Sequence, residues 1–260
     1  MQIMVYPPSM QGEGSFNGGK ITEQKPIGFS GEGSVVKRIG PLFYWAWAFS
    51  EQEGHIGLHP HQAFEIMTYV VQGKAEHGDT LGTRSVVGPG GVQIMQTGSG
   101  VSHEEHFIGP NMEAFQIWFE PELKAALQRT PTYRQFEHEQ FPIMEGDGYT
   151  LKTVIGPGAP VELVADARVW DLEAEPGSSF SYTIPAGRSL AVLAIRGHGA
   201  WIQQTGDHQS AETAFHQRDF MTLRADAESS LTLRPEEGGK LRLIGIEVPT
   251  TVPYSQYPKR

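Results

Sequence analysis

The stretch 57–106 is GLHPHQAFEIMTYVVQGKAEHGDTLGTRSVVGPGGVQIMQTGSGVSHEEH. It alternates short runs of Val, Ile, Met and Tyr with turns rich in Gly and Pro, a pattern typical of β-strands joined by tight connections. Two of these runs, 66–72 and 91–96, are predicted strands, and the Gly-Pro-Gly-Gly turn at 88–91 lies between them. The stretch therefore predicts antiparallel β-structure.

The same pattern continues on both sides of this stretch. Helical periodicity is scarce, and only PELKAALQR, residues 121–129, predicts a helical turn or two between two prolines. We therefore predict an all-β chain. Its further strands are expected at 34–37, 43–49, 115–119, 150–155, 169–172, 189–196, 200–204, 219–222, 230–233 and 241–247.

Composition agrees with this and excludes several classes of protein. The 31 glycines and 18 prolines in 260 residues are about one residue in five, which favours many turns. The net charge of −10 and the lack of a basic cluster argue against nucleic acid as a direct partner. The absence of cysteine excludes disulfides and thiolate metal sites.

We expect no contact with a membrane. The longest nearly unbroken apolar stretch, residues 41–49, is far shorter than the ~18 residues of a membrane-spanning helix. The first residues, MQIMVYPPSM, lack the basic and apolar regions of a secretory signal. A cytoplasmic location is therefore expected.

A weak internal repeat predicts two similar β-units. TYVVQGKAEHG at 68–78 resembles LAIRGHGAWI at 193–202, and in both a predicted strand ends at a glycine, Gly73 or Gly197. Units of about eight short strands commonly close as jelly rolls or small barrels, because closure removes exposed strand edges.

Histidines gather in the first unit. Six of the ten lie between residues 55 and 106: His55, His59, His61, His77, His103 and His106. The pairs His59/His61 and His103/Glu105 are each spaced by two, so the members of a pair share one face of a strand. Imidazoles with one carboxylate suit Fe(II), Mn, Ni, Cu or Zn and leave coordination positions open. The alternative is a surface turn and a solvated polar loop.

At these residues the sequence resembles the pirin family of bicupins. The family's hallmark is approximately HPHxxFETxTYxxxGxxxHxDSxG followed by PGDVQxMxAGxGxxHxE, and the resemblance is specific over residues 54–106. It implies two tandem cupin jelly-roll barrels: an N-terminal domain at 1–130 with the metal site, a connector at 131–160 and a degenerate, metal-free C-terminal domain at 161–260. The implied metal ligands are His59, His61, His103 and Glu105. Iron(II) is the usual metal, and Mn, Ni, Cu, Zn or Co are alternatives.

Four positions depart from the family's pattern: Gln62, Ile66, Gly91 and Ile94. None removes an implied ligand, but Gln62 and Ile94 could change what enters the cavity.

The carboxylate ligand has two candidates. General cupins use a Glu four residues after the second His, which is the spacing of Glu65, whereas pirins use the later acid. We favour Glu105. Glu65 is then either an acid that hydrogen-bonds a ligand imidazole or the nearby turn, or an ordinary salt-bridge partner at the end of a strand.

We predict no functional site in the second unit or in the Gly-rich segment 14–21. Counting back from Gly197 by the spacing of the first unit gives Pro185 and Thr183, which cannot reproduce an imidazole pair. We therefore place His198, His208 and His216 in turns and on the surface. GSFNGGKI at 14–21 has the start of a phosphate-loop spacing, but Ile21 lacks the required hydroxyl, so it is interpreted as a flexible Gly-rich segment.

The resemblance implies an enzyme: a metal-dependent dioxygenase with quercetin 2,3-dioxygenase-like activity on a flavonol and O2, in which Glu105 also serves as general base. The alternative is a metal-containing regulatory or binding protein whose metal state controls contacts with a protein partner. A storage or structural bicupin is a third hypothesis. The resemblance also implies a monomer. The sequence leaves open the physiological substrate, the identity of the metal and the oligomeric state.

Overall fold

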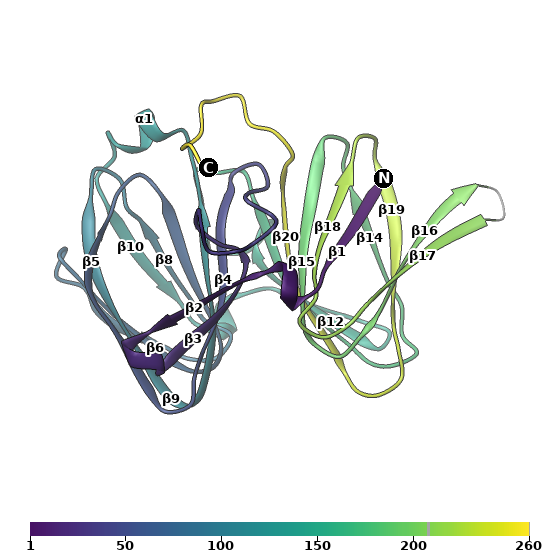
Figure 1. The fold of residues 1–260 in the computed structure, drawn as a ribbon, viewed down its shortest axis with the longest axis horizontal. Coiled ribbons are helices and arrows are strands. Elements are labelled where there is room, and N and C mark those ends of the chain that lie inside the picture. The colour runs from purple at the N-terminus through teal and green to yellow at the C-terminus, as the bar shows by residue number, and fades with distance from the viewer. Residues whose placement is uncertain (207–208, 260) are drawn as a thin grey trace. The chain divides into compact units, whose positions relative to one another are not determined.

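The computed structural model describes residues 1–206 and 209–259 and is nearly all β (Figure 1). Its contacts divide the chain into two units. The N-terminal cupin unit comprises residues 10–140, 161–165 and 252–260, and the C-terminal cupin unit comprises residues 1–9, 141–160 and 166–251. The predicted all-β class with two cupin-like units is confirmed.

The N-terminal cupin unit is built on one extensively bent sheet. Its strands follow in the order β10-β8-β6-β9-β4-β3-β2, while β5 pairs with β9 and β7 pairs with β6. The elements are β2 (Gly12–Phe16), β3 (Ile21–Ile27), β4 (Leu42–Ser50), β5 (Glu53–His61), β6 (Glu65–Asp79), β7 (Arg84–Val87), β8 (Val92–Gln96), β9 (Val101–Phe119), α1 (Leu123–Ala126) and β10 (Thr132–Phe136).

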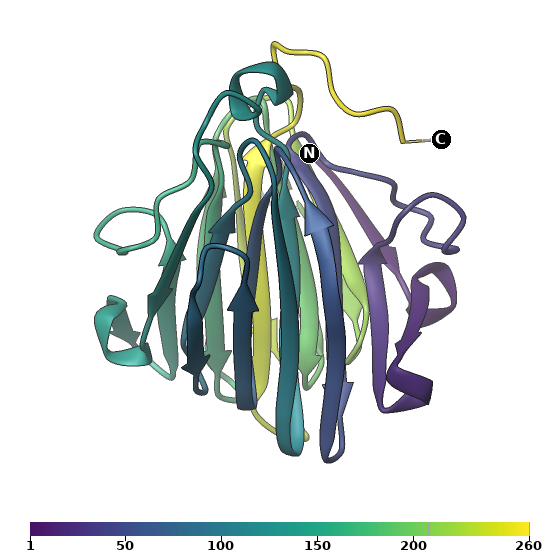
Figure 2. The same cartoon turned by 90° about the vertical axis from the view of Figure 1, so that its left-hand side faces the viewer.

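Two long strands, β6 and β9, hold this unit together. They pair antiparallel with each other over most of their length, with register shifts around Gln72, and Figure 2 shows the long antiparallel strands of the unit side by side. Gly73 has φ +75°, and a Cβ there would lie 2.8 Å from the carbonyl oxygen of Ile108. Only glycine therefore fits where β6 bends against β9.

Along the inner face of β9, the side chains change from apolar to polar and back to apolar. Val101 belongs to one buried apolar cluster and Phe107 to another, while His103 and Glu105 lie between them in sequence and are also buried. The regular alternation of buried and half-buried residues over this part of β9 puts all four on one face. A polar section therefore interrupts an otherwise apolar interior.

The C-terminal cupin unit has two sheets. One follows the order β1-β18-β15-β20-β13-β12-β11 and the other the order β14-β19-β16-β17. The elements are β1 (Gln2–Tyr6), β11 (Ile143–Gly146), β12 (Tyr149–Ile155), β13 (Arg168–Ala174), β14 (Phe180–Ile184), β15 (Arg188–Arg196), β16 (Gly199–Gly206), β17 (Gln209–Phe215), β18 (Phe220–Ala225), β19 (Ser229–Pro235) and β20 (Leu241–Pro249).

The interior of the C-terminal cupin unit is filled with apolar side chains, among them Trp170, Trp201 and Phe215. Gly197, between β15 and β16, has φ +72°, and its Cβ position lies 3.0 Å from the backbone of Leu241. It therefore meets the same constraint as Gly73, which explains the weak repeat around these two glycines.

The structure differs from the sequence-based expectations at several places. Residues 131–160, the expected connector, contain β10, β11 and β12, and β1 pairs with β18 in the C-terminal cupin unit. The predicted strand at 34–37 is absent, and the Gly-rich segment 14–21 forms the turn between β2 and β3 instead. The strand predicted at 150–155 is β12, whereas β1 and β10 were missed because their partners, β18 and β8, are remote in sequence. His208 lies outside the described residues.

Within the described ranges, no helix is long and apolar enough to cross a membrane.

Candidate metal centre

A one-residue bulge in β5 puts the His-Pro-His motif on the inner face of the sheet. Ile56 lies opposite Glu105 of β9, but His59 lies opposite His103, so the register shifts by one residue between Ile56 and His59. Because side chains alternate along a strand, this shift brings His59 and His61 to the face that already carries His103 and Glu105.

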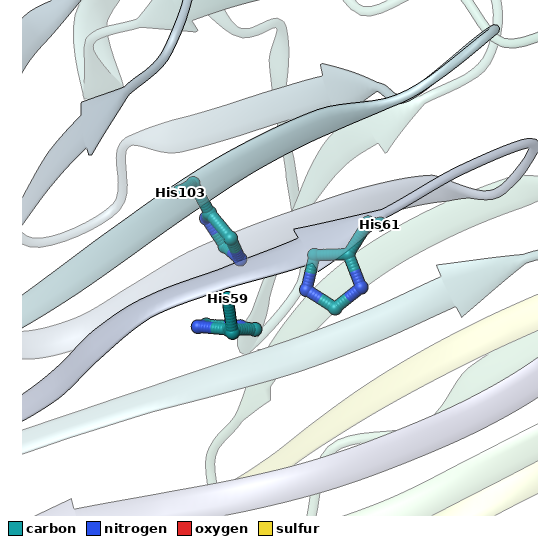
Figure 3. A group of neighbouring side chains, drawn as sticks. All are labelled: His59, His61 and His103. Atoms are coloured by element: carbon teal, nitrogen blue, oxygen red, sulfur yellow. The ribbon is translucent and has the colours of Figure 1, made fainter.

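The three imidazoles converge in the N-terminal cupin unit. Their ring centroids are 4.5 Å apart for His59 and His103, 4.7 Å for His59 and His61, and 4.9 Å for His61 and His103. One nitrogen from each ring lies within 4.8 Å of the other two. Figure 3 shows the three side chains pointing toward a common space from β5 and β9.

Burial keeps the imidazoles of His61 and His103 neutral. Loss of solvation, followed by repulsion from the neighbouring rings of His103 and His59, lowers the pKa of His61 to about 3. Loss of solvation and the neighbouring His59 and His77 lower the pKa of His103 to about 3 as well. Neutral rings keep a lone pair for a cation at pH 7, which is the form in which histidine binds metals.

Two ring nitrogens at this place lack a hydrogen-bond partner among the described residues. His59 Nδ1 donates to the Gly57 carbonyl oxygen at 2.8 Å, which leaves its Nε2 as an acceptor. His61 Nε2 and His103 Nδ1 are buried without a hydrogen-bond partner among the described residues. Buried polar atoms are normally satisfied, and a divalent cation would satisfy several of these at once. The residues present therefore fit a metal ion.

Glu105 is on the same face of β9 as His103 and is 4% exposed. Its Oε1 accepts a 2.6 Å hydrogen bond from Gln116 Nε2, while its Oε2 is buried and has no partner among the described residues. The group of ligand atoms within 4.8 Å of one another consists of the three imidazoles. One carboxylate oxygen of Glu105 is thus held by Gln116 and the other remains available.

Glu65, the other candidate carboxylate, is fully engaged elsewhere. Its oxygens accept hydrogen bonds from Gln96 Nε2 at 2.6 Å and from the backbone N–H groups of Val164 and Ala165, each at 2.8 Å. Burial raises the pKa of Glu65, and these donors oppose the rise. Its carboxylate fastens segment 161–165 to β6, a role that only long-range contacts could reveal.

A cavity of about 550 Å³ opens beside the imidazoles. It is lined by Pro60, His61, Gln62, Thr80, Gly100, Val101 and Ser102. A larger cavity, of about 670 Å³, lies around the start of β5 and contains none of the candidate ligands. Of these two cavities, only the smaller one is lined by a candidate ligand, His61, and Gln62, one of the departures from the pirin pattern, also lines it.

The remaining histidines are placed differently. His55 and His106 lie opposite each other on β5 and β9, on the outer face, and approach glutamates there. His198 and His216 approach Glu236 and Asp219 at the surface of the C-terminal cupin unit. His77, which the sequence argument left without a role, is buried next to His103, with ring centroids 5.4 Å apart.

Comparisons with known proteins give a consistent result. The family model described as Pirin matches residues 45–119. A Pirin-like protein of Caulobacter vibrioides is 34% identical over 156 residues, which cover 56% of this chain and 55% of that protein. A Pseudomonas aeruginosa protein named "Putative quercetin 2,3-dioxygenase" is 31% identical over 177 residues, 65% of this chain and 71% of the relative.

Solved structures share the fold over nearly the whole chain. A crystal structure of quercetin 2,3-dioxygenase from Acinetobacter baumannii has a TM-score of 0.76 at 21% identity, covering 98% of this chain and 89% of that one. The bacterial pirin YhhW from Escherichia coli, in complex with nickel(II), has a TM-score of 0.74 at 21% identity, covering 96% of this chain and 100% of that one.

Proposed function

The chain belongs to the pirin family, and from this premise we propose that it is a metal-dependent dioxygenase acting on a flavonol such as quercetin. We propose that His59, His61, His103 and Glu105 hold the metal and that the substrate enters through the cavity beside His61. Relatives named as quercetin 2,3-dioxygenases support the substrate class. The observation that carries the proposal is the convergence of three imidazoles, the half-buried His59 and His61 and the buried His103, whose ligand atoms lie within 4.8 Å of one another.

Iron(II) is the metal we propose first, because the family resemblance implies it. The nickel(II) complex of the Escherichia coli pirin makes nickel an alternative, and imidazole donors also accept Mn, Cu, Zn or Co. When bound, such an ion would supply a Lewis acid toward the hydroxyl and carbonyl oxygens of the substrate, and every one of these ions except Zn would also supply a redox-active centre for dioxygen.

The protein's own residues perform three tasks in this proposal. His61 and His103 stay neutral because burial lowers the pKa of each to about 3. Gln116 fixes Glu105 through its Oε1, so Oε2 is free to accept the proton that leaves the flavonol hydroxyl. The apolar ring of Trp118, 4.7 Å from the ring of His61, helps to exclude water from the site.

The entrance has the right size and chemistry for a small aromatic substrate. Binding cavities for small molecules commonly measure about 300–1,000 Å³, and the cavity beside His61 measures about 550 Å³. Gln62, Thr80 and Ser102 give it hydrogen-bonding groups, while Pro60 and Val101 give it apolar surface. This mixture suits a flat polyphenol.

Oxygen uptake tests the proposal. Protein loaded in turn with Fe(II), Ni(II), Mn(II) and Co(II) should consume O2 with quercetin, and the His59→Ala, His61→Ala double variant should not. His106→Ala, on the outer face of the same strand as His103, is the matched control and should keep full activity. Absence of metal-dependent turnover across a flavonoid panel would favour the regulatory protein instead.

We also propose that the protein acts as a monomer in the cytoplasm, with the flavonol and O2 as its partners. The family resemblance and the acidic composition support this proposal. Sedimentation of the metal-loaded protein tests the oligomeric state.

A further inference from the structure

A buried carboxylate–histidine pair lies directly across the sheet from the candidate ligands of β9. In the pairing of β6 with β9, His77 is opposite Glu105 and Asp79 is opposite His103. The side chains of His77 and Asp79 are 4% and 0% exposed. His77 Nε2 and Asp79 Oδ2 are 2.8 Å apart, the distance of a charge-assisted hydrogen bond.

Asp79 is anchored by the backbone. Its Oδ1 accepts hydrogen bonds from the N–H groups of Leu81 and Thr83, both at 2.9 Å. These bonds and the contact with His77 lower the pKa of Asp79 against the effect of burial, which by itself raises it. The turn after β6 thus holds a negative charge beside His77.

His77, held by Asp79, packs next to the ring of His103. Tyr133 of β10 stacks on the His77 ring, with ring centroids 4.2 Å apart and an interplanar angle of 16°. The ring of His103 lies at 5.4 Å. Tyr133 is held in turn by its hydroxyl, 2.5 Å from Ser85 Oγ. The Tyr133–His77–His103 packing leaves the His103 ring little freedom to rotate.

This support contrasts with that of His59. Imidazoles that bind metals usually donate their second N–H to an acceptor, which fixes the ring, and His59 does so to Gly57. Within the described part of the chain, no hydrogen bond fixes either ring nitrogen of His103, whichever of the two faces the metal. The orientation of His103 therefore depends on the rings packed against it, and His77 is the one among them fixed by a carboxylate.

We propose that the Asp79–His77 pair is an outer part of the metal site that orients His103 and places a second negative charge near the cation. It thereby sets how tightly the site holds a divalent ion. The inference rests on the proposed metal site. The added charge strengthens binding because Coulomb attraction acts through a buried, weakly screened environment. Asp79 and His77 are positioning residues and do not touch the ion.

A titration with Co(II) alone tests this inference. Calorimetry and the visible absorption of the bound ion monitor the titration. Asp79→Asn keeps the Oδ1 acceptor for Leu81 and Thr83 but removes the charge. Its dissociation constant for Co(II) should rise about 10-fold or more, the usual effect of losing an outer partner. The Co(II) spectrum should also shift, because His103 changes orientation.

His77→Phe provides an independent variant that keeps an aromatic ring between Tyr133 and His103 and leaves Asp79 in place. It should lose a similar factor in Co(II) affinity. The double variant should lose no more than either single one, because the two residues act as a unit. His106→Ala, on the outer face of β9, is the matched control, with affinity expected within twofold of the wild type.

The outcomes separate this inference from the proposed function. If the wild type does not bind Co(II), the metal site itself fails. If the wild type binds and both variants bind within twofold of it, with an unchanged spectrum, the role of the pair is overturned. If Asp79→Asn lowers the melting temperature of the metal-free protein, the Co(II) affinity of His77→Phe is the deciding measurement. A loss of about 10-fold in that affinity supports the role of the pair. An unchanged affinity overturns it.

Discussion

His59 and His103 lie directly opposite each other on two antiparallel strands, with ring centroids 4.5 Å apart. Their alignment depends on the extra residue of β5 between Ile56 and His59. If β5 paired with β9 in regular register from Ile56 onward, His59 would lie opposite Ser102, and His59 and His61 would occupy the outer face, where His55 and His106 lie. The bulge is therefore as necessary to the metal site as the histidines themselves.

Inserting one glycine after Leu58 tests the role of the register. Leu58 is 61% exposed, so the insertion disturbs little packing. It should displace the end of β5 by one residue against β9, turn His59 and His61 outward and abolish binding of Ni(II) or Co(II) in calorimetry. Gly57→Ala preserves the chain length, and its added Cβ would meet open space. That control should bind as the wild type does; tight binding by the insertion variant would contradict the prediction.

Metal should stabilise the protein through the inner histidines and not through the outer ones. A ligand at about 100 times its dissociation constant adds about 2.7 kcal/mol to the free energy of unfolding. Saturating Ni(II) should therefore raise the melting temperature of the wild type and of His106→Ala by several degrees. The melting temperature of His61→Ala should not respond. An equal response from His61→Ala and wild type would remove His61 from the site.

Glu65 should contribute to stability and not to metal binding. Glu65→Ala leaves the N–H groups of Val164 and Ala165 and the amide of Gln96 without their acceptor. An unsatisfied buried group costs about 1–3 kcal/mol, and of these three donors only the N–H of Ala165 is fully buried, so we expect a loss of about 1–3 kcal/mol in the free energy of unfolding. Denaturant titration measures this loss.

Glu162→Ala is the control for that experiment, because the side chain of Glu162 is 83% exposed and pairs loosely with Arg134. It should change stability by no more than about 0.5 kcal/mol. If Glu65→Ala lost its affinity for Co(II) while remaining folded, Glu65 would have to be reconsidered as a ligand.

Lys259 should make stability depend on pH. Burial, together with the nearby charge of Arg38, lowers the pKa of Lys259 from 10.5 to about 7. Between these values the unfolded chain binds a proton that the folded chain does not, so the stability of the wild type should rise as the pH is raised from 7 toward 10. Well below pH 7 Lys259 is charged in the folded and the unfolded chain, so the full free-energy cost of burying its charge lowers the stability.

Lys259→Met removes this titration. Its melting temperature relative to the wild type should be highest near pH 7 and fall steadily up to pH 10. Thermal unfolding at four pH values in this range measures the difference. A constant difference would show that Lys259 keeps an ordinary pKa in the folded protein.

The sequence by itself determined the β class, the family and the three imidazoles, because these depend on local patterns. Runs of β-forming residues between turns are visible over a few positions, and His59/His61 and His103/Glu105 each share a face through their spacing of two. The glycines of the repeat, Gly73 and Gly197, were visible for the same reason.

Only the tertiary structure decided which residues support the site. The bulge before His59, the hydrogen bonds of Glu65 to segment 161–165, and the stack of Tyr133 on His77 all join parts of the chain that are distant in sequence or depend on strand register. Register and packing are set by the whole sheet at once, since each strand's alignment depends on its neighbours. No local pattern in the sequence contains that information.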